Sequence, residues 1–204
     1  MLTTTQDIIT WFETLIGDAT ELSSEDELTL LQETYDEVLR FKEWEFLKKE
    51  ATGSISGTDI TQPTDFDRLC VDPVIYLGDK YNPHQVIPFT ERRSYVGQNL
   101  YFYYDARQEK FVSLSTKDTT YSFDYVYTPP ALNVATDGTA SAPVFPNRFW
   151  YLLAHKMATS NDIINLSEKA RSYTQENNAI YNAQLNNLAT WSDSLSLYRS
   201  YGSG

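Results

Sequence analysis

The sequence predicts an α+β fold, an antiparallel helical bundle (two N-terminal and two C-terminal helices) with an inserted small antiparallel β domain. Apolar residues recur every three or four positions in residues 1–40 and again in 146–191, as on one face of a helix. Residues 99–128 instead alternate between apolar and polar, which is typical of a half-buried strand. With 204 residues, 41% of them hydrophobic, the chain can bury a substantial core. The predicted segments are a helical hairpin (1–42), a β insertion domain (43–130), a loop or arm (131–145), the C-terminal helices that complete the bundle (146–191) and a C-terminal arm (192–204).

The hairpin prediction depends on helix stop and start signals. Gly17 follows the first apolar stripe, where a left-handed C-cap is expected. Ser24 and Glu27 form a capping-box pattern at the start of the second helix. The connection 18–23 is short, so the two helices should lie antiparallel.

The β domain is expected to start with a strand at Glu43–Leu47, followed by a loop at Gly53–Gly57. Val71–Leu77 is a further strand candidate, which Pro73 confines to a sheet edge or a late start. Residues 99–128 predict an antiparallel meander with turns at 105–109 and 117–118 and one aromatic face.

Helix is predicted to resume at Pro146, first as a helix buried nearly all round and then as a long helix from about 162 to 191. At 1.5 Å per residue the long helix would be about 45 Å in length. Its faces outside the apolar stripe are polar and mostly uncharged, which favours packing against a neighbour. Tyr173, Tyr181 and Trp191 occupy the stripe and are the predicted buried anchors.

The charge of the chain argues against a protein that wraps nucleic acid. The net charge is −12 and the pI is about 4.5, whereas nucleic-acid binding needs a Lys/Arg surface. Residues 1–39 contain ten acids and no Lys, Arg or His. They form either an ordinary solvated helix face or a deliberately negative surface, for which Glu25, Asp26 and Glu27 are the candidates.

No catalytic, metal or membrane signature is recognised. Gly53–Gly57 has Ile where a nucleophile elbow needs Ser, and no phosphate-binding loop is present. Asp65 and Asp67 are interpreted as solvated turn residues, and one Cys with two His is too few for a structural zinc site. No apolar run is long enough to span a membrane, and residues 1–10 do not have the pattern of a signal peptide. We therefore expect no enzyme activity, no cofactor, no metal and no membrane contact.

The order of the motifs resembles that of the head–tail adaptor proteins of tailed bacteriophages, especially the tail tubular protein A type. The motifs, each weak alone, are the acidic hairpin, Glu43-Trp44-Glu45-Phe46-Leu47, Pro63-Thr64-Asp65-Phe66, the Tyr-rich meander, Tyr127 through Leu132, Phe145-Pro146 followed by Phe149, Leu152 and Leu153, and the long C-terminal helix.

This resemblance implies a structural virion protein of the neck or tail, made in the host cytoplasm. Such adaptors form a ring, usually a dodecamer, that joins the portal to the tail nozzle and leaves a channel through which the genome is ejected. The implied partners are other copies of the chain, the portal protein, the tail nozzle protein and, transiently and without sequence specificity, the passing DNA. An acidic channel wall would repel DNA phosphates.

In adaptors of this type a C-terminal arm reaches the portal and becomes ordered on docking. The sequence after Trp191 fits a helix poorly, so residues 192–201 are predicted to be mobile in the free subunit and to dock on the portal. The predicted docking residues are Leu195, Leu197, Tyr198, Arg199 and Tyr201. Two alternatives stay open at this point: another phage neck or tail-completion protein, and, in a different class, a carbohydrate-binding module with an aromatic β face.

Overall fold

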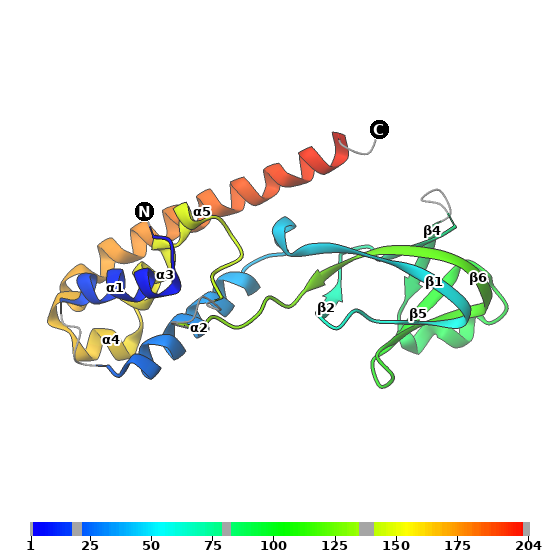
Figure 1. Cartoon of the computed structure of the whole chain (residues 1–204), viewed down its shortest axis with the longest axis horizontal. Coiled ribbons are helices and arrows are strands. Elements are labelled where there is room, and N and C mark those ends of the chain that lie inside the picture. The colour runs from blue at the N-terminus through cyan, green and yellow to red at the C-terminus, as the bar shows by residue number, and fades with distance from the viewer. Residues whose placement is uncertain (1, 18–21, 79–82, 135–140, 202–204) are drawn as a thin grey trace. The chain divides into compact units, whose positions relative to one another are not determined.

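Helices and strands separate along the chain into two units in the computed structural model (Figure 1). Unit 1 comprises residues 1–46 and 130–204 and contains the α-helices, whereas unit 2 comprises 47–129 and contains the sheet. The predicted α+β class is therefore confirmed. The structure describes residues 2–17, 22–78, 83–134 and 141–201, with the side chains of 196–201 outside the description. The α-helices are α1 (Thr5–Ile16), α2 (Ser24–Arg40), α3 (Tyr151–Met157), α4 (Asn161–Leu166) and α5 (Glu168–Tyr201), and the 3-10 helices are η1 (Glu45–Leu47), η2 (Phe89–Tyr95) and η3 (Asn147–Phe149).

The first two helices have local caps at their ends. Gly17 ends α1 in the left-handed conformation (φ 80°), and its N–H donates to the Glu13 carbonyl at 2.9 Å, as the sequence predicts. The N-cap of α2 is Ser23 and not the predicted Ser24, because the Ser23 hydroxyl accepts the Asp26 N–H at 3.1 Å.

The short helix α3 is the centre of unit 1. It contacts α1, α2 and α5, and its side chains at Leu152, Leu153, Ala154 and Met157 are fully buried. The predicted burial of this helix nearly all round is therefore confirmed. The aliphatic and aromatic stripes of the other helices close over it, which is the main hydrophobic stabilisation of this unit.

The predicted long helix is interrupted near its start. Ser167 is extended (φ −119°, ψ 121°) and separates α4 from α5, so the C-terminal part has three α-helices where two were predicted. The interruption is stabilised from both sides, because the buried Ser167 hydroxyl donates to the Ile16 carbonyl at 2.8 Å and accepts the Ala170 N–H at 3.1 Å. The side chain thereby caps α5 and satisfies a carbonyl at the end of α1.

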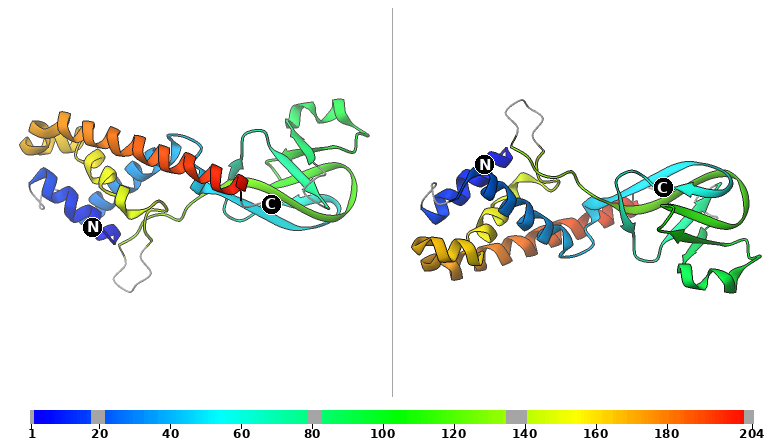
Figure 2. Two further views of the ribbon diagram at one scale, coloured as in Figure 1. Left: turned by 90° about the horizontal axis from the view of Figure 1, so that it is seen from above. Right: turned by 90° about the horizontal axis from the view of Figure 1, so that it is seen from below.

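The long helix also ends later than predicted. Both views of Figure 2 show α5, coloured orange to red, as one uninterrupted helix, and it continues to Tyr201. Residues 192–201 are thus helical in the free chain, and the prediction that they leave the helix is wrong. The described buried residues of α5 lie on one face, which contacts α1 and α3: Ala170, Asn177, Tyr181, Leu185, Leu188 and Ser192.

The sheet of unit 2 is built on two long paired strands, β1 and β6, seen curving together in Figure 2. The strand order is β1-β6-β3-β4-β5, and β5 also pairs with β6. The short strand β2 pairs with the C-terminal end of β6. The sheet is not wholly antiparallel as predicted, because β4 and β5 are parallel. The strands are β1 (Lys48–Thr61), β2 (Phe66–Leu69), β3 (Val74–Leu77), β4 (Pro83–Ile87), β5 (Tyr101–Asp105) and β6 (Lys110–Tyr127).

Three local predictions in this unit need correction. Glu43–Leu47 is not a strand, since it ends in η1, and the Gly53–Gly57 segment is not a loop but the middle of β1. Gly53 fits there because the ring of its cross-strand partner Tyr121 covers it, with the hydroxyl 2.7 Å from where a Cβ would lie. The predicted turn at 117–118 is continuous strand, because both residues pair with β1. The strand β3 starts at Val74, directly after Pro73, which confirms the late start that Pro73 predicted.

The aromatic face of the meander is the core of unit 2. The buried cluster contains Phe102, Phe111, Phe123 and Tyr125 together with aliphatic side chains of β1 and β3. Ring contacts continue through it, for example Phe111 to Phe123 at 4.8 Å between centroids. These rings therefore do not form a platform for sugars, which removes the observation behind the carbohydrate-binding alternative.

The predicted arm 131–145 is described only at its two ends, since 135–140 lie outside the described residues. Both ends are attached to α2. The Leu132 N–H donates to Gln32 Oε1 at 2.7 Å, and the Val144 N–H donates to the Tyr35 hydroxyl at 3.1 Å. The ends of this segment are therefore fixed on unit 1.

Candidate functional site

The acidic candidates on α2 do not share one face. Glu25 and Asp26 are exposed, whereas Glu27 is only 4% exposed and points into unit 1. Burial, reinforced by the nearby Glu13 carboxylate, raises the pKa of Glu27 above its ordinary value. Of the three predicted residues, Glu25 and Asp26 can therefore contribute to an acidic surface, whereas Glu27 cannot.

The predicted anchors of the long helix differ in burial. Tyr181 is buried at 7% exposure, and desolvation raises its pKa to about 12. Trp191 is half-buried and stacks on Phe46, with ring centroids 5.7 Å apart. Tyr173 is 47% exposed, so it is not a core anchor of the single chain. A large aromatic ring that is exposed in this way can contact another protein surface.

The start of the predicted C-terminal arm is bound to unit 1. Ser192 is buried, and its hydroxyl accepts the Glu45 N–H at 2.9 Å. Asp193 forms an ion pair with Lys42. Leu195 is half-buried, and the docking side chains predicted beyond it, at 197, 198, 199 and 201, lie outside the described side chains. Any free arm therefore begins after Leu195.

The outer surface of α5 is free of charge over a long stretch. No charged residue occurs between Glu176 and Asp193, and several of the intervening side chains are exposed. They are Asn178, Ala179, Asn182, Ala183, Asn186, Asn187 and Thr190. Surfaces depleted of charge are typical of the centre of protein interfaces.

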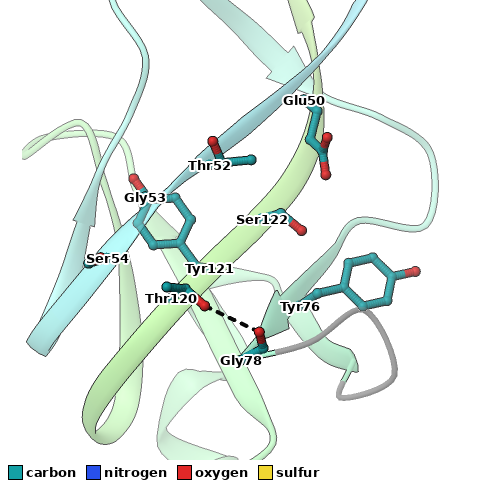
Figure 3. A pocket seen from close by; sticks show the side chains of 9 residues that line it. All are labelled: Glu50, Thr52, Gly53, Ser54, Tyr76, Gly78, Thr120, Tyr121 and Ser122. Carbon is teal, nitrogen blue, oxygen red and sulfur yellow. Dashed lines mark hydrogen bonds between the residues drawn. The ribbon is translucent and has the colours of Figure 1, made fainter.

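The sheet carries a polar cleft of about 530 Å³ over β1, β6 and β3 (Figure 3). Glu50, Ser122 and Tyr76 extend toward the same side of the sheet, whereas the Tyr121 ring lies toward Gly53. The other contributors are hydroxyl side chains and Gly78, whose carbonyl accepts the Thr120 hydroxyl at 3.2 Å. The cleft offers hydrogen bonding but has no nucleophile paired with a base.

The carboxylate considered for acid–base chemistry, Asp65, is part of a structural network instead. Its two oxygens accept hydrogen bonds from the Lys49 ammonium group and from the Tyr125 hydroxyl, each at 2.7 Å. The Lys49 bond and then the Tyr125 bond lower the pKa of Asp65, and burial together with this bond raises the pKa of Tyr125 to about 12. Asp67 pairs with the neighbouring Arg68, so each of the two acids has a cationic partner.

Other chemistry is not assembled in the part of the chain that the structure describes. No three His, Cys, Asp or Glu side chains come together there in a way that could hold a metal ion. None of the helices in the described ranges is apolar over enough length to cross a membrane. What the described surface does offer is an uncharged helix face, half-exposed rings and a polar sheet cleft.

An uncharged helix face with exposed rings beside it is typical of a surface that contacts other proteins. A family model described as SU10 adaptor protein matches residues 3–198, which is nearly the whole chain. The chain therefore belongs to the SU10 adaptor protein family, a family of structural bacteriophage proteins and not of enzymes. Membership makes the chain a virion component that interacts with other phage capsid or tail proteins. A comparison with curated proteins finds no match.

Proposed function

We propose that this chain is the subunit of a head-to-tail adaptor ring, a dodecamer that joins the portal to the tail nozzle and forms part of the DNA ejection channel. Membership of the adaptor family over residues 3–198 carries the proposal. The uncharged outer face of α5 supports it, because neutral polar side chains cost less to desolvate in a subunit contact than charges do.

In this proposal the hairpin 1–42 and the helices of 146–191 complete one bundle that makes the ring, and the β domain 43–130 is inserted between them. Synthesis in the host cytoplasm and incorporation into the neck of the virion follow from the same role.

The acidic surface is proposed to keep DNA moving. With a net charge of −12 on each subunit, the ring repels phosphates, and Glu25 and Asp26 are exposed α2 carboxylates that would face the channel or its mouth. Lys at both positions should leave ring assembly intact and slow DNA ejection, because cations bind phosphates within a Debye length of about 8 Å. The matched control is Glu27→Gln, which changes a buried acid. Ejection at the unaltered rate in the double Lys variant would show that these charges are an ordinary solvated face.

The portal contact is proposed to lie at the end of α5, with Leu195, Leu197, Tyr198, Arg199 and Tyr201 as docking residues. The helical backbone through Tyr201 means that the docking element is presented as a preformed helix, which lowers the ordering cost of binding. Avidity in a ring multiplies each weak contact.

The decisive experiment is cryo-microscopy of the purified chain mixed with purified portal rings. A closed ring of this chain seated on the portal is the expected result. The comparison variant is a deletion of 196–204, which spares the contacts of Ser192 and Asp193 with the rest of unit 1 and should therefore keep the melting temperature. The proposal fails if the full-length chain does not bind portal, and the assignment of Leu197, Tyr198, Arg199 and Tyr201 as docking residues fails if the truncated chain still saturates the portal.

A further inference from the structure

The connection between β4 and β5 in unit 2 carries exposed apolar side chains. It covers residues 88–100 and includes η2, the short green helix in both views of Figure 2. Phe89 is 37% exposed and Val96, the residue after η2, is 74% exposed. A single exposed apolar side chain is ordinary on a protein surface, so the argument depends on what surrounds these two.

Four aromatic rings from η2 and β5 form a cluster beside them. Tyr101 and Tyr103 alternate along β5 with the buried Phe102, so they lie on the sheet face opposite to the core of unit 2. From η2, the Phe89 ring lies 5.6 Å from the Tyr103 ring and the Tyr95 ring lies 4.5 Å from the Tyr101 ring, measured between centroids. All four rings keep some exposed surface. Aromatic side chains gathered on a surface are typical of protein interfaces.

Arg92 is held over this cluster with hydrogen-bond donors to spare. Its guanidinium carbon lies 3.6 Å from the centroid of the Phe89 ring, and its Nη1 donates to the Phe89 carbonyl at 2.7 Å. Nε and Nη2 keep their N–H groups, and no ion pair joins Arg92 to a residue that the structure describes. A guanidinium fixed in this way suits a carboxylate, which it can bind through two parallel hydrogen bonds. We call Arg92 and the four rings the η2 patch.

The charge of this region is opposite to that of the rest of the chain. The charged residues of 83–104 are Glu91, Arg92 and Arg93, which give a net charge of +1 and leave −13 on the other residues. Arg93 is exposed next to the η2 patch. The two arginines favour a carboxylate-bearing partner, and the exposed Phe89 and Val96 are covered only by a partner that also has apolar side chains.

A nucleic acid fits the η2 patch less well than an acidic protein segment. The Arg92 guanidinium already lies over a face of the Phe89 ring, where a base would have to stack. A phosphate backbone also needs a continuous basic groove, whereas the residues outside 83–104 carry a net charge of −13. A short acidic segment meets the two arginines without this repulsion along its length.

We propose that the η2 patch is a docking site for an acidic, apolar segment of another virion protein. A carboxylate of the segment binds the Arg92 guanidinium, and an apolar side chain of the segment covers Phe89 and Val96. Members of the adaptor family interact with other phage capsid or tail proteins, which supplies partners of this kind. The site lies on unit 2 and uses neither α5 nor the proposed portal residues, so it goes beyond the proposed function.

The test uses the full-length chain and a displayed library of random peptides. Peptides are selected on the wild-type chain, the most enriched one is synthesised with a fluorophore, and its Kd is measured by fluorescence anisotropy. The test variants are Arg92→Glu and Val96→Ser. Arg107→Glu and Val71→Ser are the matched controls, because both residues are exposed elsewhere in unit 2. Circular dichroism melting checks that each variant is folded.

The enriched peptides are expected to combine Asp or Glu with Leu, Ile, Phe or Trp. Arg92→Glu should weaken binding of the peptide at least about tenfold through loss of a charge-assisted pair. Val96→Ser should weaken it about fivefold through loss of apolar contact. Both control variants should bind like the wild type, and binding should weaken as salt is added.

Three results would overturn the proposal. The first is a selection that enriches no acidic, apolar peptide, or a peptide that binds Arg92→Glu as tightly as the wild type. The second is binding of labelled oligothymidine that Arg92→Glu abolishes, because the patch would then take a phosphate backbone. The third is self-association, measured by sedimentation velocity, that Arg92→Glu alone removes, since the occupant would then be a second copy. None of these results bears on portal binding, so failure here is distinct from failure of the proposed function.

Discussion

Replacement of Ser167 by alanine tests how much the hydrogen bonds at the junction between α4 and α5 contribute to the free energy of unfolding of unit 1. The hydroxyl has two bonds, to the Ile16 carbonyl at 2.8 Å and from the Ala170 N–H at 3.1 Å, and the side chain is buried. Alanine keeps the backbone path but removes both bonds. The expected result is a less stable unit 1 with an unchanged fold.

The magnitude follows from the two bonds. Loss of an N-cap costs about 1 kcal/mol, and a buried carbonyl left without a donor costs about 1–3 kcal/mol. The sum is roughly 2–4 kcal/mol. For a chain of this size each kcal/mol lowers the melting temperature by about 2–4 °C, so the transition should fall by roughly 5–15 °C.

The assay is thermal unfolding followed by circular dichroism at 222 nm, where helices dominate the signal. Ser172→Ala is the matched control, because this serine lies at an exposed position of α5, the helix that Ser167 caps. Its transition should lie within about 1 °C of wild type, as for ordinary surface substitutions. If Ser167→Ala melts together with Ser172→Ala, the hydroxyl does not stabilise the junction and the reasoning is refuted.

Three further predictions concern charge and packing. Glu27→Gln should raise the melting temperature at pH 7, because the raised folded-state pKa of Glu27 means that its carboxylate form destabilises the folded chain. The difference in melting temperature between variant and wild type should vanish below about pH 4, where Glu27 is protonated in both states, and an equal difference at pH 7 and pH 4 would contradict this. Asp65→Asn should remove stability of unit 2 that is present above about pH 4 and lost as pH falls through the lowered folded-state pKa, so denaturant titrations of variant and wild type should converge in acid. Trp191→Ala should cost about 2 kcal/mol by urea unfolding, below the ~3–5 kcal/mol of a fully buried Trp, because the ring is half-buried; a cost near zero would identify it as an interface residue only.

Local patterns in the sequence were sufficient for the main elements. The 3.6-residue period identified the two N-terminal helices and the buried helix of 151–157, and the alternation from 99 to 128 identified the central strands. Gly17 was correctly predicted as a C-cap, since a left-handed residue after an apolar stripe is a local signal. The α+β class followed from these patterns alone.

Details that depend on pairing between distant segments were missed. The turn predicted at 117–118 is strand because these residues pair with Gly57 and Ser56 of β1, which lie 60 and 62 positions earlier in the chain. The aromatic face of the meander was visible, but its burial depended on the closure of β5 onto β6. Alternation identifies two faces of a strand and does not say which of them a second segment will cover.

The candidate sites show the same division. The sequence determined that the outer faces of the long helix are uncharged between Glu176 and Asp193 and that acids are concentrated in residues 1–39, since both are properties of composition along one segment. Only the tertiary structure decided that Glu27 is buried, that Tyr173 is exposed, and that Asn177 and His155 meet while the Asn177 Nδ2 group has no hydrogen-bond partner among the described residues. A periodic stripe fixes which residues share a helix face, but the direction of that face depends on where α1, α3 and α5 pack. That packing minimises the exposed apolar area of all the helices together, and no single helix encodes it.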